Sequence, residues 1–223
     1  MSRFYAKPIG GYTYDSVEGT ANIEAVYDYL FPEGFTKESI IGILGNVEGE
    51  SNYNPWLWEN GTYNPNDGYG LFQFTPASDY INASWLPDYA PNIDPPNTSP
   101  TADPDDAYAQ LYAFVNDTFG KWDSYCWRVD WNTTTYADLW DKRTYILNTY
   151  GNGSSLTLAQ FKTITDYSDA TFAFLACYEK PLVPNYLQRL GYAANVKTIL
   201  DNYAGYSDIL LLKKMLKRKV KYN

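Results

Sequence analysis

The sequence predicts a mainly α-helical domain with a small β component, an α+β fold in which helices dominate. Three observations lead to this prediction. Apolar residues recur at spacings of three and four along several segments, one short segment alternates like a strand, and no period of about 20 to 50 residues repeats. With 223 residues, the chain is long enough to bury one hydrophobic core.

Two amphipathic helices are predicted in the first quarter of the chain. The first covers Ala21 to Leu30 and is ended by the proline and glycine of Phe31 to Gly34. The second begins after Thr36, a side chain that favours the N-cap position, and runs toward Glu48 and Glu50. These two glutamates flank the apolar stripe of the helix, so periodicity does not distinguish between them.

The middle of the chain is rich in turn-forming residues. The segment from Ser51 to Asp67 is dense in Asn, Pro and Gly, and Gly68 to Thr75 is predicted as a short strand. Residues 86–104 contain six prolines and are predicted as a long irregular loop. A helix start follows at Asp103 to Asp106. Further helices are predicted over residues 105–119, 136–148, 157–164, 169–179 and 189–203.

The last stretch, Ser207 to Lys221, predicts a basic amphipathic helix. Such a helix suits an anionic surface or partner, or it packs as a terminal helix on the acidic body. We therefore divide the chain into a domain over residues 1–206 and a C-terminal helix over residues 207–223. Without the last eleven residues the net charge is −15, and a body this acidic repels nucleic acid, which is not expected as a partner.

Composition limits the chemistry as well. The absence of histidine excludes Ser-His-Asp and Cys-His hydrolysis and imidazole-based zinc sites, so any catalysis must use carboxylates. Cys126 and Cys177 are too few for a Cys-rich metal site and are expected to be buried apolar fillers. No metal or other cofactor is expected. No apolar run approaches the roughly 20 residues of a membrane span, and no secretory signal follows Met1.

Two segments carry the pattern with the most chemistry: Glu50-Ser51-Asn52-Tyr53-Asn54-Pro55 and Gly68-Tyr69-Gly70-Leu71-Phe72-Gln73-Phe74-Thr75-Pro76. They place a carboxylate at a helix end opposite a glycine-bearing strand. Cleaving a glycosidic bond requires a carboxylic acid that stays protonated near neutral pH, which a helix C-terminus and dry apolar walls promote. Taken alone, such a pattern is more often a buried or capping carboxylate than a catalyst. Aromatic residues make up 18% of the chain, which suits sugar stacking and a tyrosine-rich loop surface equally.

The combination Glu-Ser-x-x-Asn-Pro with a downstream Gly-x-Gly-Leu-x-Gln resembles the signature of the lysozyme-like superfamily, especially goose-type lysozymes and soluble lytic transglycosylases. A closer resemblance is to phage tail lysozymes, the N-terminal muramidase domains of podovirus tail-knob proteins. It runs from about residue 20 to residue 200. Beside Glu50-Ser51, four blocks carry it: Ile41 to Asn46, Tyr69 to Ser78, Tyr80 to Asn82, and Phe174 to Pro181.

The resemblance implies a lysozyme-like muramidase domain over residues 1–206, with a helical lobe, a small β-hairpin around residues 60–75 and a substrate cleft between them. It implies cleavage of the β-1,4 bond between N-acetylmuramic acid and N-acetylglucosamine in bacterial peptidoglycan. The protein would act from the virion, at the phage tail tip or knob, with other tail proteins as candidate partners. A catalytically inactive structural or glycan-binding tail protein is the alternative, and a free endolysin is a second one.

The resemblance also assigns roles to residues. Glu50 is the expected general acid, followed by Ser51 in the motif. Gln73 and Tyr178 are expected to orient the sugar or the acid, and Gly70 to let a sugar ring lie close to the backbone. Glu179 stands where transglycosylases have Asn, and it positions Tyr178, binds substrate or serves as a structural partner. The expected stacking wall consists of Trp58, Tyr69 and Phe74.

A second carboxylate is required by retaining and inverting glycosidases. Asp67 is the first candidate and Glu59 the next, although an Asn-Asp-Gly sequence also makes Asp67 a turn residue. If neither carboxylate is in place, a lytic transglycosylase reaction, in which a hydroxyl group of the sugar attacks, becomes the better expectation.

Overall fold

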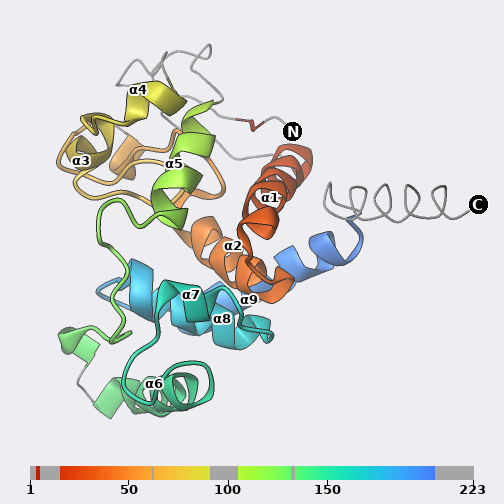
Figure 1. Cartoon of the computed structure of the whole chain (residues 1–223), viewed down its shortest axis with the longest axis vertical. Coiled ribbons are helices and arrows are strands. Elements are labelled where there is room, and N and C mark those ends of the chain that lie inside the picture. Colours follow the sequence, from red (N-terminus) through yellow and green to blue (C-terminus); the bar gives the residue numbers. More distant parts are fainter. Residues whose placement is uncertain (1–3, 6–15, 62, 91–104, 132–133, 204–223) are drawn as a thin grey trace, which may run out of the picture.

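The computed structural model describes residues 4–5, 16–61, 63–90, 105–131 and 134–203. Within these ranges the chain is mainly helical, as the sequence predicts (Figure 1). The α-helices are α1 (Ser16–Leu30), α2 (Lys37–Ser51), α3 (Ala77–Ile81), α4 (Leu86–Tyr89), α5 (Asp105–Val115), α6 (Ala137–Thr149), α7 (Leu158–Phe161), α8 (Tyr167–Phe174) and α9 (Tyr186–Asp201). A π-helical turn, η5 (Leu175–Glu179), continues α8, and short 3-10 turns are η1 (Phe31–Glu33), η2 (Glu59–Gly61), η3 (Val129–Trp131) and η4 (Thr134–Tyr136).

Helix α2 is central to the core and packs against both α8 and α9. Thr36 caps its N-terminus by accepting a hydrogen bond from the Ser39 N–H at 3.1 Å, as predicted. Glycines make the close packing possible, since a Cβ at Gly42 would lie 2.5 Å from the carbonyl carbon of Ala170. A Cβ at Gly45 would lie 2.7 Å from the Cβ of Ala193. The glycines of α2 therefore set how closely α8 and α9 approach it.

The C-terminal end of α2 is fixed at a defined residue. Asn52 takes the left-handed conformation, with φ 50°, and its N–H donates to the Glu48 carbonyl at 2.9 Å, which ends the helix. The Ser51 hydroxyl donates to the carbonyl of Leu71 at 3.0 Å and thereby attaches the helix end to the following loop. Glu50 is consequently held in the last turn of α2.

The predicted strand over Gly68 to Thr75 is wrong. In this described segment the only β pairing consists of two isolated antiparallel bridges, Trp58 with Tyr69 and Tyr69 with Phe74. Gly70 and Gln73 have φ angles of 81° and 43°, and two left-handed residues this close turn the backbone instead of extending it. The alternation of apolar residues arises because the ring side chains of this turn are buried in the core.

Other elements differ from prediction at their ends. Helix α1 begins at Ser16, five residues before the predicted start, and α3 was not predicted. Helix α4 occupies the start of the predicted loop over residues 86–104; residues 91–104 lie outside the described ranges, as do 207–223, where the basic helix is predicted. Helix α5 ends at Val115 rather than residue 119, since Asp117 takes the left-handed conformation with φ 45°.

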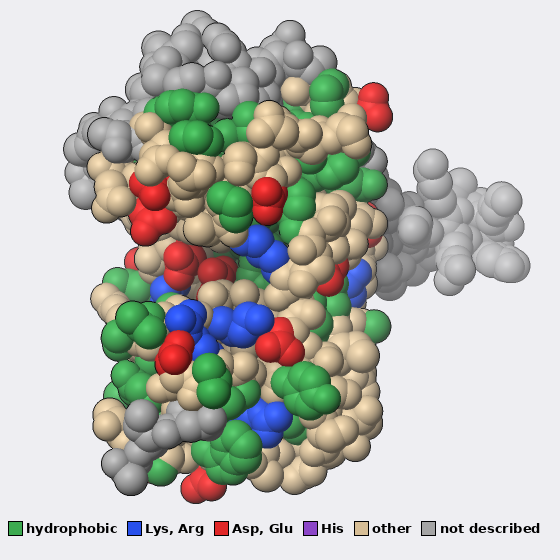
Figure 2. All heavy atoms as spheres, turned by 90° about the vertical axis from the view of Figure 1, so that its left-hand side faces the viewer, with side chains coloured by type: hydrophobic (Ala, Val, Ile, Leu, Met, Phe, Trp, Pro, Cys, Tyr) green, Lys and Arg blue, Asp and Glu red, His purple; other side chains and the backbone are tan. Residues whose placement is uncertain are grey.

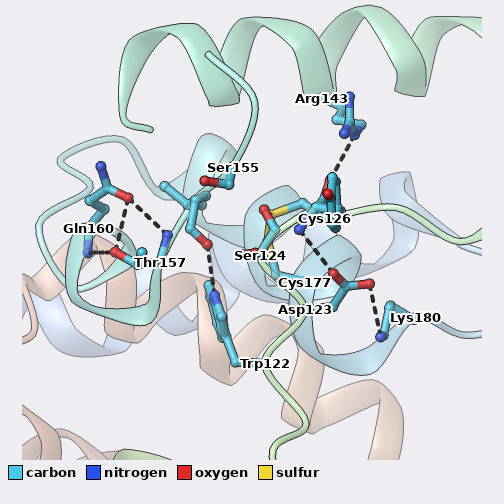
Figure 3. Close-up of a disulfide and its surroundings, with 12 residues drawn as sticks. Trp122, Asp123, Ser124, Cys126, Arg143, Ser155, Thr157, Gln160, Cys177 and Lys180 are labelled. Atoms are coloured by element: carbon cyan, nitrogen blue, oxygen red, sulfur yellow. Dashed lines mark hydrogen bonds and ion pairs between the residues drawn. A yellow bond between two sulfur atoms is a disulfide. The ribbon is translucent and has the colours of Figure 1, made fainter. Parts of the chain in front are cut away.

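Cys126 and Cys177 are buried, but they are not the free fillers that the sequence suggested, because they form a disulfide bond (Figure 3). The bond joins the loop after α5 to the turn η5. The same two segments are also joined by the Asp123 N–H, which donates to the Cys177 carbonyl at 2.7 Å, and by the Lys180–Asp123 ion pair at 3.2 Å (Figure 3). Three contacts therefore hold η5 in place.

Within the described part of the chain, no helix combines the length and apolar character that crossing a bilayer requires. The same residues hold no cluster of acidic and cysteine side chains suited to a metal ion.

Candidate active site

A cavity of about 600 Å³ lies beside the C-terminal end of α2. Figure 2, which views the molecule from the left-hand side of Figure 1, shows acidic side chains in a hollow with Lys and Arg side chains along its edge. The cavity is lined by Glu50, Leu57, Trp58, Glu59, Asn60, Gly61, Phe72, Gln73, Thr75, Lys121, Tyr178, Glu179 and Pro181. Residues from α2, the 57–75 loop, the loop after α5 and the turn η5 therefore meet at one place.

The structure shows which of Glu48 and Glu50 faces the cavity, a choice that helical periodicity leaves open. Glu50 lines the cavity. Glu48 does not, and its Oε2 accepts a hydrogen bond at 2.6 Å from the hydroxyl of the buried Tyr53. Of the two glutamates at the end of α2, only Glu50 can reach a ligand in this cavity.

Glu50 is not the isolated acid in dry surroundings that the sequence suggested. Its Oε1 forms an ion pair with Nη2 of Arg189, which comes from α9. The Arg189 guanidinium also donates to the carbonyl of Asn46 and lies against Gly49, where a Cβ would overlap it. The arginine side chain is 9% exposed and the glutamate side chain 19%. A charged partner, and not an apolar wall, therefore defines the environment of Glu50.

Glu179 is the carboxyl group of the cavity that the fold buries most deeply by one oxygen. Its Oε1 is buried and has no hydrogen-bond partner among the described residues, although the residue as a whole is partly exposed to the cavity. Burial raises the pKa of Glu179 well above 4.5, and the nearby charge of Glu50 raises it further, against the opposing effects of Arg189 and Lys121. These surroundings favour the protonated form of Glu179.

Tyr178 also lines the cavity, and its ring is packed rather than free. It stacks on Phe174, with ring centroids 4.9 Å apart, and meets Phe72 edge-on at 5.8 Å. Burial, followed by the charge of Glu179, raises the pKa of the Tyr178 hydroxyl far above 10, so the group stays protonated. Tyr178 therefore presents a neutral hydroxyl on a ring that its neighbours immobilise.

Gln73 lines the cavity and stabilises the loop around it. Its side-chain amide donates to the carbonyls of Gly70 at 2.9 Å and Leu57 at 3.1 Å. Both of these hydrogen bonds are to the backbone of the loop, and neither reaches the expected acid, Glu50. Gly70 itself does not line the cavity; a Cβ there would overlap the side chain of Gln110.

The expected stacking wall is mostly part of the core. Tyr69 and Phe74 are buried and do not line the cavity. The Tyr69 hydroxyl donates to Oδ2 of Asp106 at 2.5 Å, and Phe74 stacks on Tyr80 with centroids 5.0 Å apart. Trp58 does line the cavity, but it is only 1% exposed and packs on Tyr69.

The two candidates for a second carboxylate differ in position. Glu59 is exposed at the cavity, and its Oε2 accepts the Gly68 N–H at 2.9 Å. Asp67 does not line the cavity; its N–H closes a turn onto the Asn64 carbonyl at 3.0 Å. Ser51 is likewise buried outside the cavity lining. The turn interpretation of Asp67 describes its position, and Glu59 is the candidate that a ligand can reach.

Two charged residues of the site were not predicted from the sequence. Lys121 lines the cavity and lies over the ring of Phe74, with Nζ 5.6 Å from the centroid. Nothing in the sequence around Lys121 marks it. Arg189 could have been found from the helical pattern, because it lies on the buried face of α9. Ala193, Val196 and Leu200 follow it on that face at spacings of four, three and four. An arginine in an apolar stripe indicates a buried charge partner.

Comparisons with known proteins give one family and a phage relative. The model of the phage tail lysozyme family matches residues 21–200. Among curated proteins, Morphogenesis protein 1 of Bacillus phage B103 is 46% identical over 66 residues, which are 29% of this chain and 18% of that protein. The matched segment thus spans less than a fifth of that relative.

Proposed function

The chain belongs to the phage tail lysozyme family, and from this premise we propose that it is a virion-associated peptidoglycan hydrolase. The proposed reaction is cleavage of the β-1,4 bond between N-acetylmuramic acid and N-acetylglucosamine. Cleavage at the tail tip or knob would open the host cell wall locally during entry. The observation that carries the proposal is the pair of glutamates, Glu50 and Glu179, that line one cavity from two different elements.

In the proposed mechanism Glu50 is the catalytic carboxyl group and protonates the departing glycosidic oxygen. Its place in the last turn of α2 is supported by the Ser51 contact and the Asn52 cap. Tyr178 and Gln73 line the same cavity and would orient the sugar. Ser51, Asp67, Tyr69, Gly70 and Phe74 would act indirectly, as the scaffold of the loop that borders the cavity. No cofactor enters the reaction.

Hydrolysis requires a group that activates water, whereas a lytic transglycosylase uses a hydroxyl group of the sugar itself. Glu59 is the carboxylate in the cavity that could accept the proton of the attacking water. Mass spectrometry of digested peptidoglycan separates the two reactions. Reducing ends indicate attack by water, 1,6-anhydro ends indicate intramolecular attack, and an intact glycan contradicts the proposed activity.

A glycan-binding tail protein without activity is the alternative, and the Arg189–Glu50 ion pair is the observation that favours it, because a carboxylate bound by arginine has no proton to give. Glu50→Gln separates the two, since binding to cell walls would survive and cleavage would not.

A free endolysin is the second alternative, and it is tested by locating the protein in purified virions. Detection in virions supports the tail assignment, and absence from them contradicts it.

A further inference from the structure

The proposed general acid forms an ion pair with Arg189. This contact to a guanidinium is one that a carboxylate makes, not one that a protonated acid makes through the same oxygen. A general acid must hold a proton when the glycosidic bond breaks. Another group close to Glu50 must therefore supply one.

Glu179 is placed to hold that proton. It ends the π-helical turn η5, where Lys180 takes the left-handed conformation and its N–H donates to the Leu175 carbonyl at 2.8 Å. The disulfide at Cys177 and the contacts of Asp123 fix the same turn. Because the turn is fixed, the side chain of Glu179 stays at the cavity with its Oε1 buried and unpartnered among the described residues.

The charges around Glu179 explain why it is the glutamate that keeps a proton. Glu50 faces it from α2, Arg189 from α9 and Lys121 from the loop after α5. Arg189 is already bonded to Glu50 and Asn46, and the Lys121 ammonium is 3.4 Å from the Thr75 carbonyl.

The adjacent Lys180 is paired with Asp123. No cation forms an ion pair with Glu179 in the described part of the chain, so a second negative charge beside Glu50 would be buried without a directly bonded counter-charge.

We propose that Glu179 is the proton-holding partner of Glu50: the proton rests on Glu179 in the free protein and passes to Glu50 for delivery to the substrate. This inference rests on the proposed function. The O–H bond of Glu179 breaks as an O–H bond forms on Glu50, and the proton then moves to the glycosidic oxygen as the C1–O bond breaks. The attacking water or sugar hydroxyl bonds to C1 and loses its proton, to Glu59 where water attacks, and the Glu50–Glu179 pair then takes up a proton from the solvent. Glu179 thus acts through Glu50 as a positioning residue.

The test is the pH–rate profile of Glu179→Gln on purified peptidoglycan. Glutamine keeps the shape of the neutral acid but has no carboxyl proton to pass on. We expect the activity at neutral pH to fall by about a hundredfold, which is a typical rate contribution of a general acid, while the activity at acid pH persists. The descending limb of the profile should therefore move to lower pH. Glu179→Asp retains a protonatable group and should preserve most of the neutral-pH activity.

The matched control is Glu33→Gln, which removes an exposed glutamate that does not line the cavity and should leave the profile unchanged. An unshifted profile in Glu179→Gln, or an equal loss of rate at every pH, would overturn the inference, because a purely structural role predicts one of these results.

A spectroscopic measurement separates failure of the inference from failure of the proposed function. In the infrared difference spectrum between the wild-type protein and Glu179→Gln at pH 7, we expect the C=O stretch of one protonated carboxyl group. This band does not depend on activity. Its absence contradicts the inference even if the protein cleaves peptidoglycan, whereas its presence in a protein that leaves the glycan intact contradicts only the proposed function.

Discussion

Arg189 on α9 forms an ion pair with Glu50, which lies 139 residues earlier in the last turn of α2. The guanidinium fits there because residue 49 is a glycine, and it adds a hydrogen bond to the Asn46 carbonyl. One side chain therefore both joins α9 to the end of α2 and provides the charged partner of the proposed catalytic group.

Arg189→Gln should lower the free energy of unfolding by about 2 kcal/mol, since it removes charge-assisted hydrogen bonds to two partners. The substitution also removes a positive charge that lowers the pKa of Glu179, so the descending limb of the pH–rate profile should move to higher pH. Denaturant titration and pH–rate measurements check the two effects. Lys197→Gln, which breaks the exposed pair with Asp201, should cost less. An equal cost for both variants would contradict this account.

The space around two helical glycines, one in α2 and one in α9, predicts opposite effects on stability when each is replaced by alanine. Gly42→Ala places a methyl group 2.5 Å from the backbone of Ala170 and should destabilise the protein by about 1 to 3 kcal/mol. Gly191→Ala, in α9, places a methyl group in open space and should stabilise the protein by up to about 1 kcal/mol through helix propensity. Thermal unfolding of both variants checks the signs, and a stable Gly42→Ala protein would show that α2 and α8 are not in close contact.

The disulfide between Cys126 and Cys177 closes a loop of 51 residues. By the chain-entropy model its loss should cost about 4 kcal/mol. The Cys126→Ala/Cys177→Ala protein should also be less active, because the bond fixes the turn that carries Tyr178 and Glu179. Chemical denaturation with and without reductant checks this prediction: the wild-type protein should be weakened by reductant and the double variant should not. A wild-type protein that is insensitive to a reductant able to open the bond would contradict it.

Glu179 should make stability depend on pH in a direction unusual for a glutamate. Its pKa is raised in the folded protein, so the folded state binds more protons than the unfolded chain at pH values between about 4.5 and the raised pKa. The free energy of unfolding should therefore fall as the pH rises through that window, and Glu179→Gln should remove the fall.

The sequence has no histidine, so no side chain with an ordinary pKa titrates between about pH 5 and 8. Besides Glu179, only the α-amino group would then change the free energy of unfolding in this range. If the free energy of unfolding changes with pH in the same way in the wild-type protein and in Glu179→Gln, the pKa of Glu179 is not raised.

Much of the helical framework could be predicted from local pattern. The Thr36 cap and the apolar stripe of α2 depend only on neighbouring residues, and both are observed. The strand predicted over Gly68 to Thr75 fails because alternation does not show that Gly70 and Gln73 adopt left-handed conformations.

The candidate site depends even more on tertiary contacts. The motif places Glu50 at a helix end, but its partner Arg189 arrives through the packing of α9 on α2. The burial expected for Glu50 is found instead at Glu179, on the π-helical turn that the disulfide joins to the loop after α5. The place of Arg189 in the apolar stripe of α9 indicates a buried charge partner but does not identify it, and no local pattern in the sequence indicates the burial of Glu179.

The most direct test of the central claim compares the wild-type protein with Glu50→Gln on purified Gram-positive peptidoglycan, measuring both glycan fragments released and protein bound. We predict that the wild-type protein releases fragments, that the variant releases them at least about a hundredfold more slowly, and that both bind the wall equally. Circular dichroism should show that the variant is folded. A folded Glu50→Gln protein that cleaves the glycan at the wild-type rate would contradict the claim.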